Sequence, residues 1–352
     1  MIRVFVSIVT YKSRQYIEAC LESLFKQDFG RDQYRVVISD NATTDGTLEF
    51  VRARYPQVEI IENKANLGFA GGNNVVFRKA KQEKIPYVVL VNYDIVADPG
   101  WLRELIAKAD SEPRAGSVQS LILLHDKPRL INSSGNRIHY LGFGYTGGYL
   151  QDKDSFGCSD SDEMANASGC AVLYRMEVLD KTGYFNPAFV AYHEDLDLGW
   201  RLRLAGYTNI LAKKSIIYHK YEFGRSISKY YLMERNRWMV LLTHYDWRTL
   251  WVILPMFLAV EAGMIFFSIR NGFWRQKAKA VFYFWNPKNI FSVLADRERV
   301  QSIRKVKDRE IVSIFDSEIL FQGDIAQNSW VTHLGNPVLR FYWTWAKRLI
   351  IW

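Results

Sequence analysis

The first ninety residues alternate between short apolar runs and segments with helical spacing, and this alternation most constrains the fold. The apolar runs lack helical periodicity, as expected of strands buried on both faces. Between them, apolar side chains such as Ile17, Leu21 and Leu24 recur every three or four residues. The predicted strands occupy residues 3–9, 34–39, 58–61 and 87–91, and the predicted helices occupy residues 13–26, 44–54 and 71–84. We therefore predict an α/β fold whose mixed, mainly parallel sheet is flanked by helices.

Polar side chains follow several of these strands where each strand ends. Thr10, Asp40, Asn41 and Asp94 all occupy such positions. In an open parallel sheet, ligands bind beyond the carboxyl ends of the strands, so these four side chains are expected to converge on one crevice. Asp and Asn also open turns without binding any ligand, and for Asp40 and Asn41 alone the two interpretations carry equal weight.

Residues 62–74 (ENKANLGFAGGNN) form a segment rich in Gly and Asn before a predicted helix. Glycines let backbone N–H groups approach a phosphate or sugar, and a helix start favours anions, although the segment could equally be a simple connection. The spacing matches neither GxGxxG followed by an acidic residue nor GxxxxGK[ST]. A dinucleotide site and a P-loop are therefore disfavoured.

Six segments, in order, carry a resemblance to a known family: VSIVTYK, VVISDNATTDGT, NKANLGFAGGNN, VNYDI, ASGCAVLYR and HEDLDLGWRLRLAGY. Together they resemble family-2 inverting glycosyltransferases with the Rossmann-like GT-A fold, in particular the rhamnosyltransferase-like branch. The resemblance covers roughly residues 3–226 and implies a nucleoside diphosphate sugar donor, with deoxythymidine-diphosphate-rhamnose favoured. It also implies nucleotide-sugar contacts from Thr10, Tyr11, Asp40, Asn41, Asn66, Gly68, Phe69 and Asn73.

The metal motif of the family, DxD, is replaced here by Asn92, Tyr93 and Asp94. The resemblance makes Asp94 a ligand of Mn²⁺ or Mg²⁺, because hard divalent cations prefer oxygen ligands. Asn92 offers a neutral carbonyl or a ribose contact, and Tyr93 belongs to the same nucleotide-sugar site. His219, after a β-rich run, matches the histidine that binds the metal in relatives, and imidazole suits Mn²⁺ better than Mg²⁺.

The acidic segment HEDLDLGWR is expected to carry the chemistry. By the resemblance, Asp195 is the catalytic base that takes the proton of the acceptor hydroxyl, and Glu194 orients the acceptor or neighbouring groups. Asp197 is expected to be a structural or helix N-terminal charge. Trp200 and Arg201 are predicted to contact the acceptor. The alternative is that these acids merely charge the first turn of a helix.

Arg225 and Ser226 follow the predicted metal histidine closely. A guanidinium and a hydroxyl suit a diphosphate leaving group, so both are predicted nucleotide-sugar contacts. The predicted catalytic domain therefore comprises residues 1–226. Residues 227–352 are predicted to form a second, helical region.

Charge and tryptophan separate this second region from the first. Residues 225–352 contain 19 Lys and Arg against 10 Asp and Glu, whereas residues 1–224 contain 27 of each, so all of the net charge of +9 lies in the second part. Nine of the 11 tryptophans also lie there. Basic residues mixed with tryptophan are typical of segments that meet an anionic membrane surface, so we expect membrane association.

The stretch 250–269 is long enough to cross a bilayer but contains Pro255 and Glu261. A helix in the interface or a helical hairpin is therefore favoured over a full span, and a soluble core helix or homo-oligomer interface stays open. The basic residues expected to flank it are Arg235, Arg237, Arg248, Arg270, Arg275, Lys277 and Lys279.

Three cysteines without CxxC spacing indicate neither a disulfide framework nor a zinc site, and the start of the chain lacks signal-peptide character. The expected location is the cytoplasmic face of the cell membrane, peripheral or monotopic. No nucleic-acid motif accompanies the basic charge, so nucleic acid is not an expected partner. We predict transfer to a lipid-linked saccharide; transfer to a polyprenyl phosphate and a non-catalytic sugar-nucleotide-binding scaffold are the alternatives.

Overall fold

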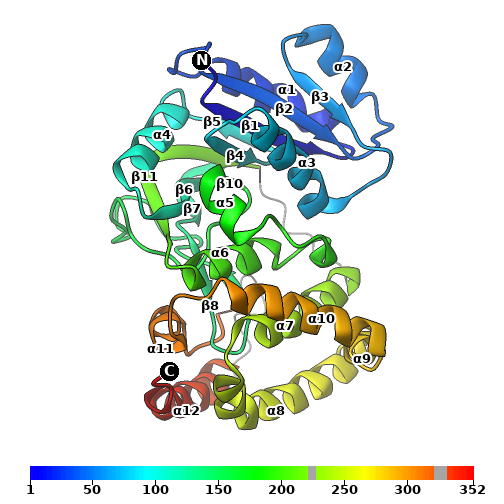
Figure 1. Cartoon of the computed structure of the whole chain (residues 1–352), viewed down its shortest axis with the longest axis vertical. Coiled ribbons are helices and arrows are strands. Elements are labelled where there is room, and N and C mark those ends of the chain that lie inside the picture. Colours follow the sequence, from blue (N-terminus) through cyan, green and yellow to red (C-terminus); the bar gives the residue numbers. More distant parts are fainter. Residues whose placement is uncertain (221–226, 321–330) are drawn as a thin grey trace. The chain divides into compact units, whose positions relative to one another are not determined.

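A computed structural model describes residues 1–220, 227–320 and 331–352 of the chain (Figure 1). It divides into two compact units, one of residues 1–136, 146–202 and 207–222 and one of residues 137–145, 203–206 and 223–352. The division near residue 222 lies close to the predicted one at 226. The sequence did not suggest that residues 137–145 and 203–206 belong to the second unit.

The first unit is built on a nine-stranded sheet of order β3-β2-β1-β4-β10-β6-β11-β5, with β7 paired to β6. The strands are β1 (Val4–Thr10), β2 (Tyr34–Asp40), β3 (Glu59–Glu62), β4 (Tyr87–Val91), β5 (Ile95–Ala97), β6 (Ala115–Leu124), β7 (Lys127–Ser133), β10 (Ala171–Arg175) and β11 (Thr208–His219). Strands β1 to β4 run parallel, as do β6 and β11, whereas β10 is antiparallel to both β4 and β6. The predicted mixed, mainly parallel sheet is confirmed.

Helices cover both faces of this sheet because its central strands are apolar on both sides. Val4, Val6 and Ile8 of β1 pack with one cluster of buried side chains, and Phe5 packs with another. The first cluster includes residues of α1 (Arg14–Phe25), α2 (Thr47–Arg54) and α4 (Trp101–Ser111), and the second includes residues of α3 (Gly68–Gln82), α5 (Met176–Thr182) and α6 (Glu194–Leu204). The expected strand burial is therefore observed.

The second unit is helical. Its main helices are α7 (Ile227–His244), α8 (Trp247–Arg270), α9 (Trp274–Tyr283), α10 (Pro287–Ser302), α11 (Asp308–Ile311) and α12 (Asn336–Leu349). A two-stranded sheet of β8 (Asn136–Ile138) and β9 (Gly144–Thr146) completes the strands. Helix α8 contains the stretch 250–269 that the sequence singled out. It is the one helix of the described residues long and apolar enough to cross a membrane, and only 17% of its most apolar window is buried.

Candidate active site

Two strands bring the predicted metal ligands together. Asp94 lies between β4 and β5, and the register of β11 on β5 places His219 opposite Ile95. The backbone N–H of Lys220 also donates to the carbonyl of Asp94, at 2.9 Å. As a result, Nε2 of His219 lies 3.3 Å from Oδ1 of Asp94. Residues 125 positions apart thus meet at one edge of the sheet.

The surroundings of this pair fit a divalent cation. Nδ1 of His219 lies 2.9 Å from Oδ1 of Asn132, which accepts a hydrogen bond, so Nε2 is the atom that faces Asp94. Oδ1 of Asp94 is buried and accepts no hydrogen bond from the described residues. A separation of 3.3 Å is near the roughly 3 Å between adjacent ligands of an octahedral ion with bonds of about 2.1 Å.

The protein supplies only part of such a coordination shell. In the described part of the chain, no group of three or more His, Cys, Asp and Glu side chains could hold a metal. Mg²⁺ and Mn²⁺ sites commonly draw their other ligands from substrate phosphates and water. Burial acts to lower the pKa of His219, but Cys170 and Asp94 outweigh it and raise that pKa to about 10. A proton on Nε2 and a cation are therefore alternative partners for Asp94.

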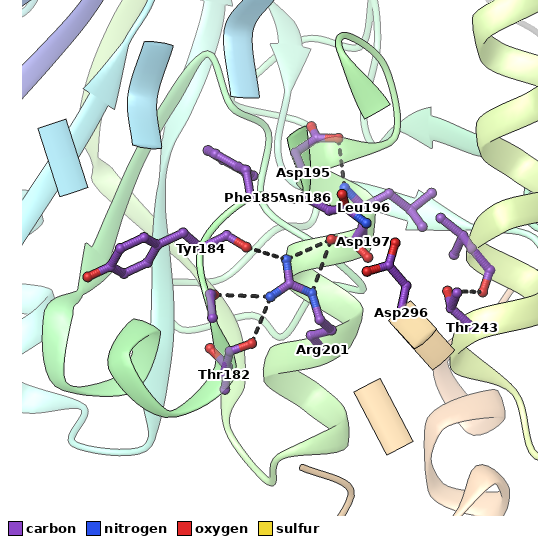
Figure 2. Close-up of polar contacts among 12 residues, drawn as sticks. Thr182, Tyr184, Phe185, Asn186, Asp195, Leu196, Asp197, Arg201, Thr243 and Asp296 are labelled. Atoms are coloured by element: carbon purple, nitrogen blue, oxygen red, sulfur yellow. Dashed lines mark hydrogen bonds and ion pairs between the residues drawn. The ribbon is translucent and has the colours of Figure 1, made fainter. Parts of the chain in front are cut away.

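The two acids of the HED segment occupy the first turn of α6. Oδ2 of Asp195 accepts hydrogen bonds from the backbone N–H of Gly169 and from Nδ2 of Asn136, both at 3.3 Å. Its Oδ1 accepts from the N–H of Leu196 at 2.8 Å (Figure 2). Burial raises the pKa of Asp195, against the lowering effect of these backbone donors. The carboxylate is therefore oriented by the fold and is a stronger base than an exposed aspartate.

Glu194 lies in a more apolar environment than its neighbour. Its Oε2 is buried and has no hydrogen-bond partner within the described residues. Burial, together with the charge of Asp195, raises the pKa of Glu194 well above the ordinary value. Close carboxyls of unequal environment titrate as a pair, and Glu194 is the member that keeps its proton to higher pH.

The metal pair and the acidic pair are joined by two consecutive residues. Gly169 donates its N–H to Asp195, and the carbonyl of Cys170 accepts from the N–H of Asn92 at 3.0 Å. Cys170 directly precedes β10, whose first residue pairs with Val91 of β4. The peptide before β10 thus sets the spacing between the predicted base and the predicted metal site.

The segment before Glu194 has a strained backbone. Val190, Tyr192 and His193 have φ values of 63°, 65° and 66°, in the left-handed region that side chains with a Cβ rarely adopt. Gly68 supports this segment closely: a Cβ on it would lie 2.6 Å from the carbonyl oxygen of Val190. Such strain persists only where surrounding structure enforces it, and it is common at functional sites. The Gly-rich segment and the acidic segment therefore fit each other here.

Arg201 holds the preceding loop from inside the protein. All five of its N–H groups donate: two to Oδ2 of Asp197, at 3.1 and 2.6 Å, and three to backbone carbonyls of residues 182–184 (Figure 2). Arg201 and Trp200 are each only 1% exposed. The prediction that these two residues contact the acceptor is therefore wrong, because neither reaches a surface. Asp197 has the structural role that the sequence suggested.

Several predicted nucleotide contacts are buried and already hydrogen-bonded. Thr10 donates to Oδ1 of Asp40 at 2.8 Å. Asn41 donates to the carbonyl of Gly68 at 3.0 Å, and Asn73 bonds both Ser7 and the carbonyl of Phe69. Asn73 is 1% exposed with both ends of its amide occupied, so the prediction that it lines the pocket is corrected: it ties α3 to β1.

Other predicted contacts are open to solvent. Tyr11 is 41% exposed and Asn66 is exposed, while Phe69, Asn92 and Tyr93 are partly buried. Arg225 and Ser226 lie outside the described residues.

Sequence reasoning missed three residues of the site, Asn132, Asn136 and Gly169. Their signal was present in the polar run NSSGN and in ASGCAV, but nothing in one sequence shows which strands bring these segments to the carboxylates.

Comparison with known proteins shows which family the chain resembles. A sequence model described as Glycosyl transferase family 2 matches residues 5–183, about half of the chain. N-acetylglucosaminyl-diphospho-decaprenol L-rhamnosyltransferase of Mycobacterium tuberculosis is 27% identical over 237 residues, which cover 61% of this chain and 75% of that protein. Rhamnosyltransferase WbbL of Escherichia coli is 24% identical over 212 residues, 58% of this chain and 78% of that protein.

Solved structures show the same fold. GalNAc-T7 with UDP, GalNAc and Mn²⁺ has a TM-score of 0.58 at 14% identity, over 74% of this chain but only about half (51%) of that protein. TarS 1–349 of S. aureus in complex with UDP-GlcNAc has a TM-score of 0.53 at 18% identity, over 92% of this chain and 95% of that one. The GT-A architecture expected from the sequence is confirmed.

Proposed function

Because the chain belongs to glycosyl transferase family 2, we propose that this glycosyltransferase moves a sugar, with inversion, from a nucleoside diphosphate donor to a saccharide on a lipid carrier. The observation that carries the proposal is the link through Gly169 and Cys170, which fixes a carboxylate beside a metal-compatible Asp94–His219 pair. An inverting transfer needs a base on one face of the anomeric carbon and stabilisation of the leaving diphosphate on the other.

Asp195 acts as the base in this proposal. The acceptor hydroxyl oxygen bonds to the anomeric carbon, the bond from that carbon to the diphosphate breaks, and the hydroxyl proton passes to the Asp195 carboxylate. Hydrogen bonds from Gly169, Asn136 and Leu196 orient the carboxylate, and its partial burial strengthens it as a base. Glu194, which keeps its own proton more readily, positions neighbouring groups.

Asp94 and His219 would hold Mn²⁺ or Mg²⁺, which would neutralise charge on the diphosphate when bound. Asn132 fixes which nitrogen of His219 faces the ion. The side chain of Asn92 offers an amide in place of a second carboxylate, and its backbone N–H donates to the carbonyl of Cys170. The metal site therefore rests on one carboxylate and one imidazole of this chain.

Rhamnose is the favoured sugar, because two relatives are named rhamnosyltransferases. The name of the mycobacterial relative also includes a diphospho-decaprenol acceptor, which supports a lipid-linked saccharide as the acceptor. The proposed location, at the cytoplasmic face of a membrane, follows from the sequence prediction alone. Transfer to a bare polyprenyl phosphate differs only in the acceptor group.

The test is transfer from a panel of nucleotide sugars, including deoxythymidine-diphosphate-rhamnose and UDP-GlcNAc, with Mn²⁺, with Mg²⁺ and with a chelator. The wild type is compared with Asp94→Ala and Asp195→Asn, and the exposed Asp126→Asn serves as the control. We expect one donor to be turned over only with metal, and both site variants to lose transfer. Product analysis separates the acceptors: a single sugar on the carrier phosphate would indicate polyprenyl phosphate instead. Nucleotide binding without any turnover would refute the catalytic proposal.

A further inference from the structure

Helix α8 has its two faces reversed with respect to a soluble helix. Its buried face consists of Thr249, Ile253, Glu261 and Ser268, of which three are polar. Between its terminal arginines, Arg248 and Arg270, every exposed residue of the helix is apolar: Trp251, Pro255, Leu258, Ala259, Ala262, Gly263, Ile265, Phe266 and Ile269. Phe266 is 69% exposed and Trp251 is 72% exposed. A face of this kind implies that something other than water covers it.

A buried ion cluster fixes the polar face of α8 inward. Glu261 is paired with Arg237 of α7 and with Lys277 of α9, whose Nζ lies 2.6 Å from Oε2 of Glu261. Glu234 pairs with the same two cations, and Trp238 donates its indole N–H to Glu261 at 3.3 Å. Burial acts to raise the pKa of Glu234, but Arg237 and Lys277 outweigh it and lower that pKa to about 2, so the cluster stays charged.

This cluster corrects one expectation from the sequence. Arg237 and Lys277 were expected among the basic residues that flank the apolar stretch. They are only 1% and 2% exposed, and both form ion pairs with Glu234 and Glu261, so they are not available to lipid headgroups. Breaking such a buried network to carry Glu261 into lipid would leave uncompensated charges. The orientation of α8 about its axis is therefore fixed by the protein.

Helix α12, which packs on α8, carries a second apolar stripe with basic neighbours. Tyr342 and Trp352 hydrogen-bond to Val252 and Thr249 of the α8 segment. Val338, Phe341, Trp345 and Leu349 are exposed at spacings of three and four residues, and their side chains are 49–69% exposed. Arg340, Lys347 and Arg348 are exposed on the same helix, which contains no acid. Arg340 is paired with Glu318 at 2.8 Å, whereas Lys347 and Arg348 have no ion-pair partner among the described residues. An apolar stripe beside such cations is typical of helices that lie on anionic lipid.

The rest of the described chain has no comparable surface. Of 24 exposed large apolar side chains, 19 lie in the second unit, and four of them are tryptophans of α8, α9 and the adjoining turns, with a fifth in α12. Indole rings favour the headgroup region of a bilayer. A second copy of the chain would instead bring its own cations against those of α12, which is unfavourable.

We propose that the outer faces of α8 and α12 dock on an anionic lipid bilayer, and that α8 lies parallel to the membrane surface without crossing it. The docking proposal rests on the proposed function in one respect only: that function requires a lipid-linked acceptor, which would lie at the same membrane surface. It assigns the lipid contacts to Trp251, Leu258, Phe266 and Phe341, and the headgroup contacts to Lys347 and Arg348.

Vesicle binding of the full chain tests the surface. We compare phosphatidylcholine vesicles with vesicles that also contain phosphatidylglycerol, at low and at high salt. Lys347→Gln with Arg348→Gln should weaken binding to the anionic vesicles about 25-fold, at about five-fold for each charge. Phe266→Asp should weaken it at least about ten-fold. Leu150→Asp, at a 50% exposed apolar residue of the first unit, is the matched control and should bind as the wild type.

Depth measurement tests the orientation of α8. Trp251→Cys, Leu258→Cys and Ile265→Cys, each carrying a nitroxide, lie seven residues apart on one stripe, or about 10 Å apart along the axis. A helix parallel to the surface places all three at one shallow depth. A crossing helix would place Leu258 deepest, or spread the three over about 20 Å, and would resist extraction with alkaline carbonate.

Three results would overturn the inference: wild-type protein that does not bind anionic vesicles, labels that report a crossing helix, or Phe266→Asp that binds normally but converts a dimer to a monomer. Each variant is also assayed for transfer to a soluble acceptor analogue. Vesicle binding without transfer in any protein would refute the proposed function alone, and transfer without vesicle binding would refute the inference alone.

Discussion

Replacement of Arg201 should destabilise the first unit more than the loss of any surface ion pair would. In Arg201→Met, the carboxylate of Asp197, which is 2% exposed, loses its ion partner. Three backbone carbonyls of residues 182–184 lose a donor as well. Breaking one side of a buried ion pair costs about 3–5 kcal/mol in the free energy of unfolding, so we expect a loss in that range.

The double variant Arg201→Met with Asp197→Leu separates the ion pair from the carbonyl contacts. Removing both charges should recover part of the loss and leave about 1–3 kcal/mol, because the carbonyls of residues 182–184 still lack their donor. The matched control is Arg3→Met, whose partner Asp110 is about two-fifths exposed; it should cost no more than about 1 kcal/mol.

Urea unfolding followed by far-UV circular dichroism measures these differences, with the transition of each unit fitted separately. Arg201→Met should also lower kcat more than it raises KM, because the loop it holds leads into Glu194. A loss below about 1 kcal/mol for Arg201→Met would refute the assignment. So would a double variant that is no more stable than Arg201→Met.

Four further changes probe the site. Asp195→Asn should lower kcat by about 10²–10⁴-fold while calorimetric binding of the nucleotide is unchanged, because only the base is lost; a ten-fold effect or less would exclude that role. Asp94→Ala should abolish Mn²⁺ binding in the presence of nucleotide, measured by calorimetry, and unaltered affinity would place the metal elsewhere. Because the pKa of Glu194 is raised, the folded protein keeps a proton that the unfolded chain releases above about pH 4.5. Stability from this group is therefore lost as pH rises, so Glu194→Gln should gain stability relative to wild type between pH 5 and 8 in unfolding titrations; a gain at pH 5 equal to that at pH 8 would contradict this. Gly68→Ala should destabilise the unit by at least about 1 kcal/mol, because the new Cβ would meet the carbonyl of Val190; thermal unfolding checks it, and an unchanged midpoint would show that the segment relaxes.

The parallel half of the sheet could be predicted because its signal is local. Apolar runs such as residues 87–91 and helical spacing such as that of residues 14–25 identify elements without tertiary information. Helix α3 begins three residues before the predicted start, at Gly68, where the side chain of Asn66 accepts from the backbone N–H of Gly68. Such a turn before the helix depends on one side-chain contact that no periodicity reports.

The candidate site was less accessible from the sequence because burial decides the role of each polar residue. Asp94 and His219 meet as a pair at the sheet edge, and Asp94 keeps a buried oxygen that accepts no hydrogen bond from the described residues. Arg201 and Asn73 are equally polar, but their hydrogen-bonding groups are occupied inside the protein. A motif records which residue types occur together. It does not record which polar groups are already hydrogen-bonded inside the protein. Those hydrogen bonds distinguish structural residues from residues that can contact a ligand.

The reversed strand β10 also changes the polarity of the edge where these residues meet. Each parallel strand leaves the sheet there at its carboxyl end, so none of these strands begins at this edge. Because β10 enters at the edge where β4 leaves, the peptide before it can offer an amide hydrogen as well as an oxygen. The backbone N–H of Gly169 donates a hydrogen bond to Asp195, while the carbonyl of Cys170 accepts one from the N–H of Asn92. A single change of strand direction thus brings the start of one strand, with an amide hydrogen for an anion, to an edge where the parallel strands end.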